Sequence, residues 1–127
     1  MVGVSLRSDG DDGALFAYLE AELADGRILY ITEGQLRLIH AATPPASRTF
    51  RRAESRPLVP GEPTWVEFPL LPTAYQFSRG TRIRLALSGA DIDHFAPVLT
   101  DRPSTRYTLS AGWLDLPALG TVATSST

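Results

Sequence analysis

The six residues Arg82-Ile83-Arg84-Leu85-Ala86-Leu87 place an isoleucine or a leucine at every second position. Successive side chains of a β-strand point to opposite faces of the sheet. We therefore predict that Ile83, Leu85 and Leu87 face a core while the two arginines face water. The period of this pattern is that of a strand and not of a helix, so the stretch predicts a sheet with one buried face.

A hairpin is predicted around Asp25-Gly26, because glycine supplies the positive φ that tight turns require and apolar runs lie on both sides. Residues 14–32 are therefore interpreted as two paired strands, with a short helical turn expected over 71–77. Short strands with almost no helix favour an all-β jelly-roll sandwich over a sheet of βαβ units. The runs predicted to be strands are 2–8, 14–22, 27–32, 35–40, 65–70, 82–88 and 105–111.

The composition predicts a single globular domain over 1–119, followed by a small, polar and flexible tail at 120–127. The absence of cysteine excludes disulfide scaffolds, thiolate nucleophiles and cysteine metal sites. A net charge of −2 without long single-sign runs makes nucleic acid and membrane poor candidate partners. No apolar leader begins the sequence, so the expected location is the cytoplasm.

Residues 41–63 contain five of the ten prolines and show no regular periodicity, which predicts a long surface loop. Such a loop either covers or contacts a partner, or is a plain surface excursion. Its four arginines are either solvated or form salt-bridged contacts with another domain. The loop residues considered as a possible interface are Arg48, Arg51, Arg52 and Arg56.

Catalysis is considered only for Asp91-Ile92-Asp93-His94, where two carboxylates and an imidazole follow a strand. A triad needs a serine presented to the histidine, and Ser88 and Ser110 lie in no recognisable nucleophile setting. The two aspartates are more simply explained as turn residues that accept backbone N–H groups. We therefore predict no catalytic residue in this chain.

A metal site is considered for Asp9, Asp11 and Asp12, since calcium takes several oxygen ligands. These residues lack the spacing of a full calcium loop, so a solvated hairpin turn is preferred. His40 and His94 do not have the spacing of a zinc-binding pair. The prediction is no metal and no cofactor.

Four aromatic residues could form a platform for stacking sugars, or could belong to the core or to a domain interface. Because Trp65 and Phe68 fall on opposite faces of their strand, core or interface is preferred. The four residues are Trp65, Tyr75, Phe77 and Trp113, of which Trp65, Tyr75 and Trp113 join the possible interface.

Several phrases along the chain resemble the C-terminal non-catalytic domain of X-Pro dipeptidyl-peptidases. The most recognisable is Gly80-Thr81-Arg82-Ile83-Arg84-Leu85 followed by Ser88-Gly89-Ala90-Asp91-Ile92-Asp93-His94-Phe95, with Thr81 where a histidine is usual. The resemblance extends over residues 2–116. The other phrases are 12–20, 25–27, 32–37, Leu58-Val59-Pro60-Gly61-Glu62-Pro63 and 71–80.

The resemblance implies a jelly-roll sandwich, similar to galactose-binding folds, that accompanies an α/β-hydrolase domain in peptidases, cocaine esterase and acylases. The catalytic triad of such enzymes lies in the hydrolase domain, and this sequence has no Gly-x-Ser-x-Gly motif. Expected partners are that hydrolase domain and a second copy of the chain. Domains of this family begin with further strands before the one resembling 2–8, so the chain is expected to be part of such a domain, with exposed edges that favour dimers.

Overall fold

Six strands make up two antiparallel three-stranded sheets in the computed structural model, which describes residues 1–90 and 105–119. Sheet A has the order β4-β1-β6 and sheet B the order β3-β2-β5. The strands are β1 (Val2–Ser8), β2 (Ala14–Glu22), β3 (Ile28–Arg37), β4 (Pro63–Phe68), β5 (Arg82–Ser88) and β6 (Tyr107–Leu114).

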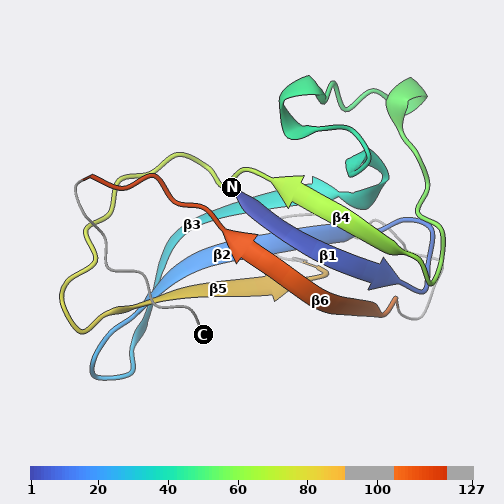
Figure 1. Cartoon of the computed structure of the whole chain (residues 1–127). Helices are drawn as coiled ribbons and strands as arrows, with labels where there is room; N and C mark the ends of the chain where they lie inside the picture. Colours follow the sequence, from blue (N-terminus) through green and yellow to red (C-terminus); the bar gives the residue numbers. More distant parts are fainter. Residues whose placement is uncertain (91–104, 120–127) are drawn as a thin grey trace.

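The two sheets lie face to face, as Figure 1 shows. Among the described strands, only β2 and β3 follow each other within one sheet, and every other connection passes between the sheets. This crossing pattern is that of a jelly roll. The predicted all-β sandwich is therefore confirmed.

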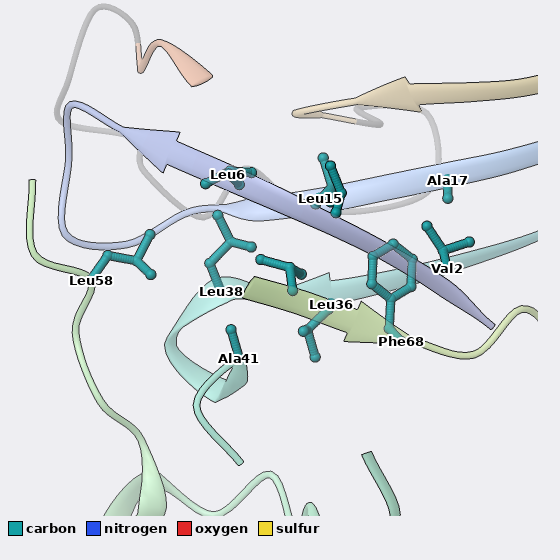
Figure 2. Close-up of a cluster of buried hydrophobic side chains, with 11 residues drawn as sticks. Val2, Leu6, Leu15, Ala17, Leu36, Leu38, Ala41, Leu58 and Phe68 are labelled. Atoms are coloured by element: carbon teal, nitrogen blue, oxygen red, sulfur yellow. The ribbon is translucent and has the colours of Figure 1, made fainter. Parts of the chain in front are cut away.

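The core lies between the sheets and is built from the alternate residues of the strands (Figure 2). In β1 the side chains of Val2, Val4 and Leu6 are buried, and from β4 the fully buried Val66 and Phe68 lie beside them in register. Leu15, Ala17 and Leu36 face them from sheet B. Burying side chains of this size contributes roughly 1.5–3 kcal/mol each relative to leaving them in water.

The alternation in β5 is confirmed for Leu85 and Leu87, which pack against this core. Ile83 lies beside the buried Ala21 on the same face, but its side chain remains 51% exposed. Figure 1 shows the reason, since the hairpin end of sheet B projects past sheet A. The inward direction of Ile83 was predicted correctly, whereas its burial was not.

The hairpin predicted over 14–32 is present as β2 and β3. Its turn is closed by Leu23 N donating to Arg27 O (2.8 Å) and by Gly26 N donating to Leu23 O (2.9 Å). Gly26 has φ +88°, which a residue with a side chain rarely adopts. The prediction of a tight turn at Asp25-Gly26, with glycine at positive φ, is therefore confirmed.

Three local predictions are wrong. The strand expected over 35–40 is the end of β3, which runs without a break to Arg37 and then tightens into a 3-10 turn, η1 (Leu38–His40). No helical turn is present over 71–77, where the chain is extended and Leu71 N donates to Glu33 O (2.8 Å). The aspartate-rich segment 9–13 is no hairpin, because it carries the chain from sheet A to sheet B.

The loop over 41–63 contains two 3-10 turns, η2 (Pro45–Ser47) and η3 (Arg52–Glu54). Figure 1 shows it standing off one end of the sandwich, while the connection 69–81 passes around the other end. Two backbone hydrogen bonds fasten its second half: Arg56 N to Ile39 O and Leu58 N to Asp11 O, both 2.8 Å. The second half of the loop is thus held to the sandwich by backbone hydrogen bonds.

Candidate functional site

The outer face of sheet A carries two indole rings that lean together over a glycine. Trp65 on β4 and Trp113 on β6 have ring centroids 6.1 Å apart with a 42° tilt, and each is 42% exposed. Gly3 on β1 lies between them and is buried. A Cβ atom added to Gly3 would lie 2.6 Å from Trp113 Cε2 and 2.8 Å from Trp65 Cζ2. Only glycine leaves room for both rings at this point.

The surroundings of the pair are small and mostly uncharged. The outward row beside it is formed by Ser5 with its register partners Trp65 and Ala111. Trp65 Nε1 donates to Glu67 Oε1 at 2.6 Å, so the polar atom of this ring is satisfied within the chain. What the pair offers to a partner is therefore mainly apolar ring surface.

The four loop arginines differ in burial. Arg48 is half-buried and its Nε donates to His40 O at 3.0 Å. Burial lowers the pKa of Arg48, while the charge of Glu67 acts in the opposite direction. The exposed group is Arg51, Arg52 and Arg56, and no ion pair with a described carboxylate holds any of them.

The charge of Glu67 acts on Arg48 in the loop, and Glu67 also accepts a hydrogen bond from Trp65 on sheet A. Tyr75 is placed elsewhere, in the connection 69–81 at the other end of the sandwich (Figure 1). Its ring packs edge-on against Phe77, with centroids 4.9 Å apart. Trp65 and Trp113 are thus brought together on sheet A, while Arg48 lies in the loop 41–63 and Tyr75 in the connection 69–81.

The aspartates once considered for calcium have other partners. Asp9 Oδ1 accepts from Arg106 N at 2.9 Å, and Asp12 Oδ2 pairs with the Arg37 guanidinium at 2.6 Å. Over residues 1–90 and 105–119, no group of three acidic, histidine or cysteine side chains is placed to hold a metal ion. His40 is buried and packs against the ring of Phe50.

The segment Asp91-Ile92-Asp93-His94 lies outside the described residues. Ser88 is engaged in a local turn, where its hydroxyl donates to Ala90 O (2.7 Å) and accepts from Ala90 N (3.2 Å). Ser110 is exposed on β6. An open depression of about 150 Å³ has a rim of Arg7, Ser8, Asp9, Gly61, Arg106 and Thr108.

In the part of the chain that the structure describes, no helix has the length and apolar character needed to cross a bilayer.

Two residues of interest were missed by sequence reasoning. The role of Gly3 depends on the pairing of β1 with both β4 and β6, which no local pattern reveals. Phe50 is an exposed side chain with φ +59°. The sequence could have indicated Phe50, because it is the sole aromatic residue among 41–63.

Comparison with known proteins extends this picture. Residues 2–123 match the model of the X-Pro dipeptidyl-peptidase C-terminal non-catalytic domain. Two relatives, from Mycobacterium bovis and Mycobacterium tuberculosis, are each named "putative serine esterase" and are 43% identical over 131 residues. The match covers 94% of this chain and 21% of each relative, so the chain spans about a fifth of their length. No solved structure matches the chain. The chain belongs to the family of X-Pro dipeptidyl-peptidase C-terminal non-catalytic domains.

Proposed function

We propose that this chain is a C-terminal accessory module of an α/β-hydrolase-type serine hydrolase, whether a dipeptidyl-peptidase, an esterase or an acylase. The observation that carries the proposal is the family match over nearly the whole chain. The relatives, which are named as serine esterases and are about five times longer than the matched region, support it. In this proposal the chain alone is not an enzyme, and the nucleophile, base and oxyanion site belong to the catalytic domain.

The module packs on the catalytic domain through the outer face of sheet A. Exposed tryptophans are unusual on a solvated sheet and are enriched in the cores of protein interfaces. Trp65 and Trp113 are presented on a floor of small residues, and the ring nitrogen of Trp65 already has its partner in Glu67. A largely uncharged surface on the catalytic domain would complete this contact.

The loop over 41–63 extends the docking surface and shapes the rim of the substrate pocket. The charge of Glu67, which is bonded to Trp65, acts on Arg48 in the loop, and this supports one partner that covers both surfaces. The exposed arginines Arg51, Arg52 and Arg56 would form salt bridges to that partner. Tyr75, at the far end, would make a separate contact.

The test is to isolate the native product that contains this chain with an antibody against it. We expect a serine hydrolase that is much larger than the 13.8 kDa of the chain and that reacts with a fluorophosphonate probe. A product of 13.8 kDa that recovers no probe-reactive protein would contradict the proposal.

A carbohydrate-binding module is the second candidate, because two exposed indoles on a sheet face are the type of surface on which sugars stack. The 42° tilt between the rings argues against a single flat platform. Quenching or enhancement of tryptophan fluorescence by oligosaccharides, lost in Trp113→Ala, would favour this candidate over docking.

Two further predictions accompany the accessory role. The module supports oligomerisation of its enzyme, which sedimentation at several protein concentrations tests, since a strictly monomeric enzyme would contradict it. The cytoplasmic location stays a prediction that cell fractionation tests.

A further inference from the structure

Phe50 is held in a conformation and a position that its residue type disfavours. Its φ of +59° lies in the left-handed region, which is uncommon for a bulky side chain. Phe50 is also 61% exposed, and it is the sole aromatic residue of the loop 41–63. Strained residues of this kind are concentrated at functional sites.

The neighbours of Phe50 hold this conformation on both sides. Thr49 Oγ1 donates to Glu54 Oε2 at 2.5 Å and accepts from Arg51 N at 3.3 Å. On the other side, Arg48 is bonded to His40 O, and the Phe50 ring stands edge-on to His40 with centroids 5.3 Å apart. The contact with His40 covers only part of the ring. The neighbouring hydrogen bonds and this contact therefore hold Phe50 in place without burying it.

The root of the loop is equally fixed. Leu58 is buried in the core, and its N–H bonds to Asp11 O, while Arg56 N bonds to Ile39 O. A side chain presented from such a fastened loop loses little conformational entropy when it binds. The loop is preorganised for contact with something outside this chain.

The charge near Phe50 indicates the chemistry of the partner. The loop holds four arginines against two glutamates, in a chain whose net charge is −2. Arg51 and Arg52 follow Phe50 directly and are exposed. Arginine beside an aromatic anchor is the composition of interface hot spots. A complementary surface would have an apolar recess with carboxylates at its rim.

We propose that Phe50 is an anchor that inserts into an apolar, acid-rimmed recess on the catalytic domain. This inference rests on the proposed accessory function and names the contact that the loop makes in it. The charge of Glu67, the hydrogen-bond partner of Trp65, acts on Arg48, two residues before Phe50, and this supports a single partner for Phe50 and the tryptophan pair. A side chain held in one conformation suits a preformed recess on a folded domain better than a fluid lipid surface, because little entropy is lost when the two fit.

Hydroxyl-radical footprinting of the whole enzyme and of the isolated 127-residue chain tests this anchor. We expect oxidation of Phe50 to be at least about tenfold slower in the enzyme, because a buried anchor is desolvated. Tyr30 is the matched control, since it is 58% exposed on sheet B and should react alike in both samples. Equal oxidation of Phe50 in enzyme and chain would overturn the anchor but leave the accessory role standing, which the fluorophosphonate test decides separately.

Substitutions distinguish an anchor from a structural residue. In the isolated chain, Phe50→Gly should keep or raise the thermal midpoint, because glycine adopts positive φ without strain. In the enzyme the same change should lower the midpoint of this module, while Ile28→Ala, an exposed apolar control on sheet B, should not. A Phe50→Gly chain that melts well below wild type would show a structural residue and overturn the proposal.

Flotation of the wild-type chain, but not of Phe50→Ala, with phosphatidylglycerol vesicles would also overturn the proposal, in favour of a lipid surface.

Discussion

The outer faces of the two sheets differ in charge although both belong to one sandwich. On sheet A, the rows across the strands combine glycine, serine, alanine, threonine and proline with the tryptophan pair, and the charged residues are Arg7 and Glu67 near its ends. The hairpin half of sheet B is charged and internally paired. There the outward residues include Glu20, Glu22, Ile28, Tyr30, Glu33, Arg82 and Arg84, with Arg84 bonded to Glu20 and Tyr30 to Glu33.

This difference indicates which face is built for water. Charged, salt-bridged rows are what a permanently solvated sheet carries, and they resist edge and face association. A face of small residues with two exposed indoles has no such protection, and apolar patches of this kind mark interaction sites. We therefore propose that the outer face of sheet A packs on the catalytic domain, and that the hairpin half of sheet B remains in solvent.

The two sides of β4 give the largest expected contrast. Phe68 points into the core and is fully buried, so Phe68→Ala should lower the free energy of unfolding of the isolated chain by about 3–5 kcal/mol. Trp65 lies on the outer side of the same strand, and Trp65→Ala should cost far less in the isolated chain. Chemical denaturation measures both, and equal losses would show that Trp65 belongs to the core and not to a docking face.

Gly3, which lies under the tryptophan pair, offers a second test of the outer face of sheet A. Gly3→Val places a side chain where both indoles lie, so the rings must move, at an expected cost of about 1–3 kcal/mol. The shifted rings should also change the tryptophan emission spectrum. Ser5→Val is the matched control, since it enlarges a side chain on the same strand and face at a position that already carries a Cβ atom. Identical spectra for Gly3→Val and wild type would contradict the pair geometry.

Tyr107 joins the two sheets, because its hydroxyl accepts a hydrogen bond from Ala14 N at 3.2 Å across the sandwich. Tyr107→Phe should therefore cost about 0.5–1.5 kcal/mol at neutral pH. Burial raises the pKa of Tyr107, so the neutral phenol stabilises the fold fully below its unfolded pKa, near 10. That contribution is lost as the pH rises through the higher folded pKa. The stability difference between wild type and Tyr107→Phe should narrow above about pH 10, and a gap that widens would contradict this.

The smallest effect is expected on the solvated face. Arg84 pairs with Glu20 at 3.2 Å with its side chain half exposed, so Arg84→Ala should cost less than about 1 kcal/mol, and less still in high salt. Thermal melts of the chain at low and high ionic strength provide the measurement. A loss of several kcal/mol that salt does not reduce would mean that sheet B is covered by structure and not by water.

The sequence predicted the strands well where side-chain alternation decides them. The runs over 2–8, 14–22 and 82–88 match β1, β2 and β5 to the residue, since each is bounded by turn residues and has one apolar face. Predictions failed where a tertiary contact decides the local structure. The segment after Arg37 tightens into η1 because Leu38 and His40 are drawn into the core, and residues near Leu71 stay extended because they bond to the edge of β3.

The candidate site could be predicted only in part. The sequence pointed to Trp65, Trp113 and the loop arginines as interface residues, and the structure brings the two tryptophans together on sheet A. It could not show that Gly3 lies under both rings, because that position follows from the register of three strands far apart in sequence. Nor could it show that Phe50 is exposed, since its backbone is set by bonds from Thr49 and Arg48 to residues outside the local pattern.

The most direct test of the docking face uses the absence of cysteine from the chain. Ala111→Cys places a thiol in the middle of the outer face of sheet A, and Gln35→Cys places one on the outer face of sheet B. Each is reacted with a maleimide in the isolated chain and in the whole enzyme, and mass spectrometry of the peptides locates the label. We predict that Cys-labelling at position 111 is rapid in the chain and at least about tenfold slower in the enzyme, while labelling at position 35 is unchanged. Equal labelling at position 111 in both samples, or protection at position 35 instead, would contradict the assignment of sheet A to the catalytic domain.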